Sequence, residues 1–211
     1  MNCRERLLNV LNGKPVDRIP VVPFIHYNLI YEYFGINKDF DLAQKDEDVD
    51  SVQLGIDLHE AFGFDIIHRT CSVWEYLDQR IYNSEDWKVT ETHENYSSTS
   101  WAITQTIQTP EKTLKQIKRY EKIFPHEIVE AILEYFIKDE SDFEQFEKFQ
   151  PPFPKLDCSD VTRTRDLLDE KGLVAPWAQG VFNSVSLYRK TENILMDAYK
   201  NPDLYKRMMI F

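Results

Sequence analysis

The sequence has few glycines and none of the glycine-rich motifs of common enzymes. Its 211 residues include 6 Gly, and the patterns GxGxxG, GxxxxGK[ST] and GxSxG do not occur. Those patterns form the phosphate cradles of nucleotide-binding proteins and the nucleophile turn of serine hydrolases. HExxH and EF-hand loops are missing as well. The sequence therefore lacks the local structures of the usual nucleotide, hydrolase, zinc-protease and calcium sites.

Cysteine is scarce, and long apolar runs are absent. Cys3, Cys71 and Cys158 are an odd number without a CxxC pair, and the opening residues lack the apolar core of a signal peptide. The most apolar stretch, Ile19 to Ile25, contains two prolines and is much shorter than the roughly 18 residues that a membrane span needs. We therefore expect a protein of the reducing cytoplasm that does not cross a membrane.

Positive charge is in deficit. The chain has 25 Lys and Arg against 36 Asp and Glu, a net charge of -11, and its isoelectric point lies near 4.9. A field of this sign repels DNA, RNA and acidic lipid surfaces. We therefore expect neither a nucleic acid nor a membrane as partner.

Hydrophobic periodicity predicts an α/β protein. A spacing near 3.6 residues with capping signals predicts helices, and short apolar runs predict strands. Helices are expected at 4–11, 28–34, 49–62, 113–120, 127–137, shortly after Asp139, and at 159–170, 192–199 and 202–209; strands at 19–24, 64–69 and 173–178; and a hairpin over 87–107.

This order of elements predicts a parallel sheet with an inserted β-hairpin. The length lies near the lower edge of the roughly 200 to 400 residues of a TIM (β/α)₈ barrel. Three candidate parallel strands and the hairpin already use the whole chain, and Met208 to Phe211 is an apolar run of the kind that precedes a strand. We therefore expect a partial TIM barrel, with residues 1–211 as a single incomplete domain.

Polar residues follow each expected strand, and α/β folds place their sites at the carboxyl ends of strands. A histidine there can exchange protons near neutral pH, an arginine can bind a carboxylate or phosphate, and a tryptophan beside an amide suits a flat or apolar ligand. Structural roles are the alternative for each residue, and Cys71 with one histidine is a weak metal signal. The candidate substrate-binding residues are His26 and Tyr27, His68 and Arg69, and Trp177, Gln179 and Asn183.

The amino-terminal stretch from Arg4 to Val21 resembles the opening of the uroporphyrinogen decarboxylase superfamily, with a first helix, a Gly and then Asp17-Arg18-Ile19-Pro20. Further segments support the resemblance, and together they extend over essentially the whole chain: the residues 63–67, 109–114, 137–142 and 200–204. The resemblance implies a TIM barrel of which this sequence is the N-terminal part.

Two branches of that superfamily differ at positions present in this chain. The true decarboxylases carry an arginine-rich segment after the first strand and an Asp after the second, which bind the tetrapyrrole. Here residues 22–31 contain no Arg and residues 66–71 contain no Asp. Losing such charge-assisted hydrogen bonds would cost about 1.5 to 3 kcal/mol each. The sequence is therefore closer to the second branch, the cobalamin-dependent methyltransferases.

For the parent protein, that branch implies transfer of a methyl group from a methylated corrinoid to a thiol. The implied cofactors are zinc and methylcobalamin, and the partners are a corrinoid protein or a small-molecule thiol. The family's zinc ligands belong to later strands, so the 211-residue chain alone is expected to bind neither cofactor and to be inactive. Two alternatives remain open: uroporphyrinogen decarboxylation, and a non-catalytic binding module that self-associates through an exposed sheet edge.

Overall fold

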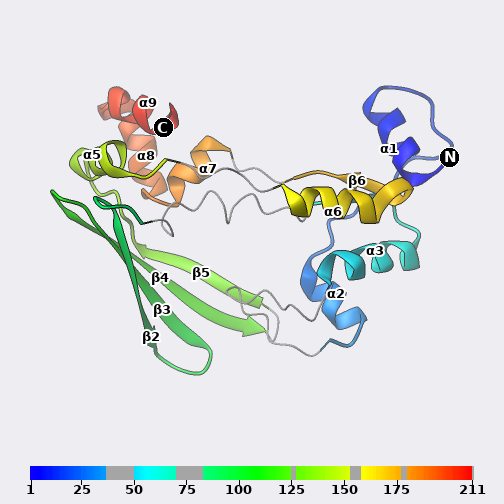
Figure 1. The fold of residues 1–211 in the computed structure, drawn as a ribbon, viewed down its shortest axis with the longest axis horizontal. Helices are drawn as coiled ribbons and strands as arrows, with labels where there is room; N and C mark the ends of the chain where they lie inside the picture. The colour runs from blue at the N-terminus through cyan, green and yellow to red at the C-terminus, as the bar shows by residue number, and fades with distance from the viewer. Residues whose placement is uncertain (37–49, 70–82, 125–126, 153–157, 177–179, 211) are drawn as a thin grey trace. The chain divides into compact units, whose positions relative to one another are not determined.

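The computed structural model describes residues 1–36, 50–69, 83–124, 127–152, 158–176 and 180–210. The chain forms two compact units that alternate along the sequence. Unit 1 comprises residues 1–75, 125–127 and 155–178, and unit 2 comprises residues 76–124, 128–154 and 179–211. Helices and strands occur in both units, which confirms the α/β class (Figure 1). The single incomplete domain stays a prediction.

Unit 1 is built on two short parallel strands. β1 (Ile66–His68) pairs with β6 (Gly172–Val174), with Ile67 opposite Leu173. Two helices, α3 (Ser51–Phe62) and α6 (Ser159–Leu168), contact each other and pack on one face of the pair. Their shared core consists of Ile56, Ile66 and Leu168, each at most 1% exposed. This arrangement confirms the expected helix-then-strand order at both places.

The described part of unit 1 contains three further elements: α1 (Cys3–Leu11), α2 (Tyr27–Tyr33) and the short 3₁₀-helix η2 (Asp169–Lys171). Helix α1 lies at the amino end of the strand pair, where Arg4 Nη1 donates to the carbonyl of Gly172 at 3.4 Å. The Ile66 amide donates to Cys3 Sγ at 3.3 Å. Helix α2 packs on α3 through a small core of Ile30, Tyr31 and Leu58.

The expected strand at 19–24 is wrong: these residues form no ladder. Pro20 and Pro23 have no amide hydrogen to donate, so a continuous ladder cannot form. Val21 alone makes a backbone bond to the start of β1, where its carbonyl accepts from the Asp65 amide at 2.8 Å. The segment therefore runs beside β1 without being a regular strand.

Unit 2 contains a four-stranded sheet in the order β2-β3-β4-β5 (Figure 1). The strands are β2 (Lys88–Asn95), β3 (Ser100–Gln108), β4 (Thr113–Phe124) and β5 (Glu127–Glu134). Strands β2 and β3 are antiparallel, with Val89 opposite Ile107, which confirms the predicted hairpin. The hairpin is thus part of a larger sheet.

The helices expected at 113–120 and 127–137 are wrong, because both segments are strands of this sheet. Strand β4 is antiparallel to β3 over Thr113 to Glu121. Apolar residues four apart, such as Ile128 and Ile132, lie on one side of either a helix or a strand, since four is a multiple of the strand repeat. The β-branched residues Thr113, Ile117 and Val129 favour the strand.

Four helices of unit 2 lie in the described residues, and α5, α8 and α9 lie near one end of its sheet (Figure 1). They are α5 (Glu140–Phe149), α7 (Val181–Ser186), α8 (Thr191–Lys200) and α9 (Pro202–Ile210). The main core joins sheet and helices through Trp87, Ile107, Leu114, Phe136, Phe146 and Met208. Asn201 caps α9, because its Oδ1 accepts from the Leu204 amide at 3.2 Å. Helix α7 is an element that the sequence pattern did not predict.

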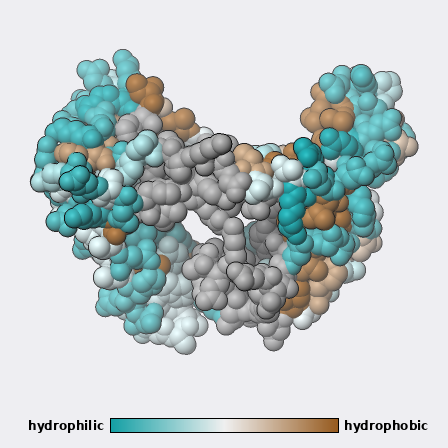
Figure 2. Space-filling view, viewed as in Figure 1, coloured by the Kyte–Doolittle hydropathy of each residue, from teal (hydrophilic) through white to brown (hydrophobic). Residues whose placement is uncertain are grey.

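Hydrophilic and apolar residues are interspersed on the visible surface (Figure 2). Several large apolar side chains of unit 1 are exposed, including Ile19 at 83% and Phe24 at 68%. Among the helices in the described part of the chain, none has both the length and the apolar composition that a bilayer crossing requires.

Candidate binding site at the carboxyl end of the parallel strands

The residues just after β1 and just before α2 meet at the carboxyl end of the strand pair. Arg69 follows β1, and its guanidinium carbon lies 5.0 Å from the centre of the Phe24 ring. The His26 ring lies on an edge of the same phenylalanine, with ring centres 6.4 Å apart. All three side chains are exposed. Phe24 thus brings together two of the predicted site residues.

Arg69 makes no ion pair with a described residue, although the chain carries 36 acidic residues. A guanidinium that lies over an aromatic ring keeps its N–H donors in its own plane, above the ring, where they can bind a ligand. Its planar fork matches a carboxylate or phosphate group. This end of the strands therefore presents an aromatic surface with one cationic hydrogen-bond donor group.

His68 precedes Arg69 but lies on the opposite face of β1. Its Nε2 is close enough to α3 that a methyl group added at Gly55 would lie 3.5 Å from it. His59, on the same helix, is hydrogen-bonded through Nδ1 to the Gly55 carbonyl at 2.6 Å. Both histidines are 7% exposed. Successive side chains of a strand point to opposite faces, so β1 places His68 under α3 and Arg69 away from it.

The environment of His68 favours the neutral imidazole. Burial lowers the pKa of His68 to about 4, with a further contribution from the nearby His59 and an opposing one from Asp50. The side chain is therefore uncharged at neutral pH. Its location and charge state are those of a packing residue between α3 and β1, and a role in substrate binding stays a prediction.

The remaining predicted site residues are not brought to this group by the described structure. Tyr27 is the first residue of α2, with His26 as the N-cap, and its side chain lies outside what the structure describes. Trp177, Gln179 and Cys71 lie outside the described residues. Asn183 is an exposed residue of α7 in unit 2, and its carbonyl accepts from Ser186 Oγ at 2.7 Å.

Phe24 is a residue of the candidate site that the sequence does not predict. It belongs to the expected strand at 19–24 and is not among the candidate binding residues. An aromatic residue directly after Pro23, in a run that cannot form a regular ladder, is the signal that could have identified it. In the structure it is the residue that contacts both His26 and Arg69.

The amino end of β1 has a different kind of charge arrangement. The Arg6 Nη1 atom lies 2.5 Å from Asp65 Oδ1, and Arg18 Nη1 lies 2.6 Å from Asp65 Oδ2. Arg6 also donates from Nε and Nη2 to the two carboxylate oxygens of Asp17, at 2.7 and 2.9 Å. The Val21 amide donates to Asp65 Oδ2 at 3.1 Å. Two arginines and two aspartates thus neutralise one another.

Asp65 is ionised in this network although it is only 1% exposed. Burial by itself would raise the pKa of Asp65, but the Val21 amide and the guanidinium groups of Arg6 and Arg18 hold the pKa below its ordinary value. Burial raises the pKa of the neighbouring Cys3 thiol, which is therefore protonated at neutral pH. These groups stabilise structure and offer no reactive thiolate.

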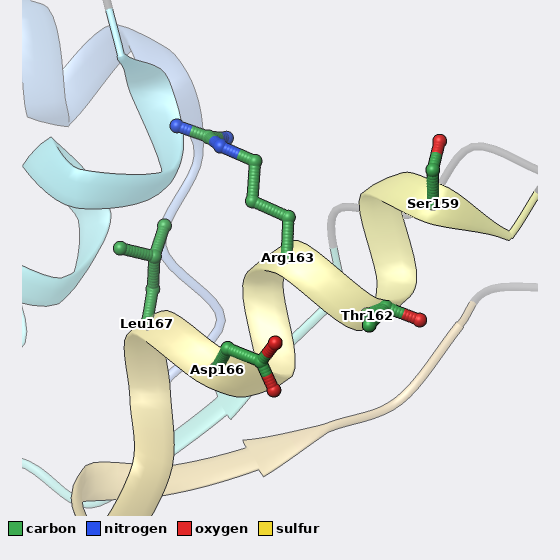
Figure 3. Close-up of a pocket in the computed structure, with 5 residues that line it drawn as sticks. All are labelled: Ser159, Thr162, Arg163, Asp166 and Leu167. Carbon is green, nitrogen blue, oxygen red and sulfur yellow. The ribbon is translucent and has the colours of Figure 1, made fainter.

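Two hollows in unit 1 have linings that do not include Phe24, His26 or Arg69. One, of about 620 Å³, follows one side of α6 (Figure 3), where Arg163 extends toward α3 and forms an ion pair with Asp50. The other, of about 430 Å³, lies at the amino end of β1 beside Cys3 and the Arg6–Asp65 pair. The arginine in each lining is already paired within the protein, Arg163 with Asp50 and Arg6 with Asp65.

A metal centre does not fit the described residues. Within the described ranges, no group of three or more His, Cys, Asp or Glu side chains is placed to hold a metal ion. His59 and His68 are two such ligands, which is fewer than a protein zinc site uses. No step of a reaction is therefore assigned to zinc on these residues.

Comparisons of the chain with protein-family models, curated proteins and solved structures find no match.

Proposed function

We propose that this chain is the N-terminal part of a barrel of the uroporphyrinogen decarboxylase type, from the methyltransferase-like branch. The parent activity would be transfer of a methyl group from a methylated corrinoid, carried by a partner protein, to a thiol. The resemblance on which this depends includes Arg6, Asp17, Arg18 and Asp65. That these residues form one ion-pair network, although they come from two distant segments, supports treating them as one motif.

The architecture of unit 1 supports the barrel part of the proposal. Its strand pair is parallel, and α3 and α6 cover the face that contains Ile66 and His68. The other face carries Ile67 and Leu173, which are half-buried. In a (β/α)₈ barrel the helices lie outside, and apolar residues of this second face fill the interior. Residues 19–24 are joined to the start of β1 by the bond from the Asp65 amide to the Val21 carbonyl, and in the proposed barrel they would precede β1 as the first strand.

The choice between the two activities of the superfamily depends on one observation, the number of cations at the carboxyl end of the strands. Residues 19–36 contain no Lys or Arg, and Arg69 is the one cationic residue in 66–69. A tetrapyrrole with many carboxylates would need several charge-assisted hydrogen bonds there. A small thiol needs one polar anchor and an apolar surface. Arg69 stacked on Phe24 supports the smaller acceptor.

The chemistry of the proposed step is a nucleophilic substitution. The thiol first loses its proton to solvent or a base, and the thiolate sulfur then attacks the methyl carbon. The methylated corrinoid, as a substrate carried by the partner protein, would supply the methyl group to this sulfur and would keep the electron pair of the carbon–cobalt bond that breaks. The residues of this chain would bind and orient the acceptor: Arg69 through its guanidinium, and Phe24 through its ring face.

A two-substrate assay tests the proposal. The 211-residue chain and any longer natural form of the protein are incubated in parallel with methylcobalamin and a panel of thiols, and separately with uroporphyrinogen. Methyl transfer is followed by the loss of methylcobalamin absorbance and by mass spectrometry of the methylated thiol. We expect thiol methylation by the longer form alone. Turnover of uroporphyrinogen without thiol methylation would contradict the proposal.

A further inference from the structure

Asp65, just before β1, is joined to segment 19–26 by two hydrogen bonds, one in which it donates and one in which it accepts. Its amide donates to the Val21 carbonyl at 2.8 Å, and its side-chain Oδ2 accepts from the Val21 amide at 3.1 Å. Because Pro20 and Pro23 cannot donate, no regular ladder fixes how this segment is aligned with β1. The pair of bonds between Val21 and Asp65 therefore sets the alignment.

The alignment decides which side chains meet at the carboxyl end. Counting along the parallel directions, Phe24 is three residues beyond Val21, and Arg69 is four residues beyond Asp65. A strand rises roughly 3.3 Å per residue, so these counts place the two side chains within about one residue's rise of each other. A slip of one residue would turn Phe24 to the opposite side of the segment. The 5.0 Å contact between Phe24 and Arg69 depends on this register.

The ion pairs around Asp65 also help to fix the alignment of segment 19–26 with β1. Two arginines converge on a carboxylate that is 1% exposed, and one of them, Arg6, is also held by Asp17. A buried ion-pair network contributes little net stability compared with apolar packing, and its best-attested use is to specify one arrangement over others. Here the carboxylate is fixed from α1 and from the loop that leads into segment 19–26, so its Oδ2 is held toward the Val21 amide.

We propose that Asp65 is a positioning residue for the candidate site at the opposite end of β1. It aligns segment 19–26 so that Phe24 stacks on Arg69 and His26 stays beside Phe24. That the contact between Phe24 and Arg69 binds an acceptor rests on the proposed function, but the alignment of segment 19–26 with β1 is a property of the fold. Asp65 does not touch the ligand.

Nuclear magnetic resonance on the full chain tests this directly. The ring current of Phe24 shifts the side-chain proton signals of Arg69 upfield, and Phe24→Leu defines complete loss of that shift. We expect Asp65→Asn to lose most of the shift, because a single amide oxygen cannot serve two arginines and the Val21 amide. Hydrogen exchange of the Val21 amide should become about tenfold faster or more. The matched control Asp17→Asn removes a neighbouring carboxylate of the same network and should keep both properties.

A second variant keeps the test decisive where Asp65→Asn does not fold. Val21→Pro removes the donor to Asp65 and leaves all four charges of the network in place. It should abolish the upfield shift of Arg69. A folded Asp65→Asn protein, or failing that a Val21→Pro protein, that retains the full shift would overturn the proposal. Neither measurement uses methyl transfer, so the inference and the proposed function can fail independently.

Discussion

The two ends of the parallel strand pair differ in how their charged side chains are paired. At the amino end, Asp65 and Arg6 are buried and paired, together with Asp17 and Arg18. At the carboxyl end, Arg69 is exposed, stacked on a ring and without an ion pair to any described residue. Charges that neutralise one another inside a fold specify its structure, whereas an exposed guanidinium over an aromatic ring, with no ion pair to a described residue, presents its donors to a ligand. Substitutions in the ion-pair network at the amino end should therefore weaken folding, and substitution of Arg69 at the carboxyl end should weaken binding.

The largest effect is expected at the amino end, from Arg6→Met. The substitution keeps the apolar stem of the side chain but removes one of the two cations on the buried Asp65 carboxylate. Removing one partner of a buried ion pair costs about 3 kcal/mol or more in free energy of unfolding. Urea unfolding followed by circular dichroism measures the loss. Arg165→Met removes an exposed arginine of the same unit and should cost less than about 1 kcal/mol. Equal losses in the two variants would remove the distinction between the ends.

Acid should weaken unit 1 through His68, which lies behind the carboxyl end. Its folded pKa of about 4 is below the ordinary 6.5, so the unfolded chain binds the proton more readily. The stability due to the neutral imidazole is therefore complete above pH 6.5 and is lost as the pH falls toward 4. The full difference corresponds to about 3 kcal/mol at most.

The measurement is the free energy of unfolding between pH 7 and pH 4. His68→Leu should flatten the pH dependence in this window. His93→Gln, at an exposed histidine of the hairpin, should leave it unchanged. A steep slope that persists in His68→Leu would assign the acid sensitivity to other groups.

Close packing at the amino end of β6 gives the next effect. A methyl group added at Gly172 would lie 2.5 Å from the Ile66 carbonyl oxygen, which is too close for any real contact. Gly172→Ala should therefore push β6 from β1 and cost about 2 kcal/mol. The control Gly55→Ala places its methyl group at ordinary contact distance from His68 and improves a helix interior, so it should cost nothing or add stability. Thermal unfolding of the two variants distinguishes them.

The sequence predicted unit 1 better than unit 2, for a physical reason. In unit 1, Gly63 in the left-handed conformation separates α3 from β1, and Gly172 follows η2 at the start of β6, so local signals mark each boundary. In unit 2, the apolar spacing of four at Ile128 and Ile132 fits a helix and a strand equally. Pairing of β5 with β4 decides the outcome, and that pairing is not written in either segment alone.

The candidate site was predictable as a location and not as a set of contacts. The strand order pointed to the residues after β1, and Arg69 and His26 do meet there through Phe24. The separation of His68 from Arg69 follows from strand alternation, but it requires knowing that α3 covers one face. The importance of Asp65 appears only when its partners from three segments are placed together.

The smallest effect on stability, and the sharpest on binding, is expected for Arg69→Met. Its stacking on Phe24 is exposed, so its removal should change the free energy of unfolding by less than about 1 kcal/mol. If Arg69 anchors the acceptor, the KM for the thiol should rise about tenfold or more in the methyl-transfer assay, because a charge-assisted hydrogen bond is lost.

Arg119, an exposed arginine that lies 5.9 Å from the ring centre of Tyr96 in unit 2, offers a matched control. Arg119→Met should have the same small effect on stability and none on KM. A loss of stability at Arg69 as large as that of Arg6→Met would show that both ends of the strand pair are structural.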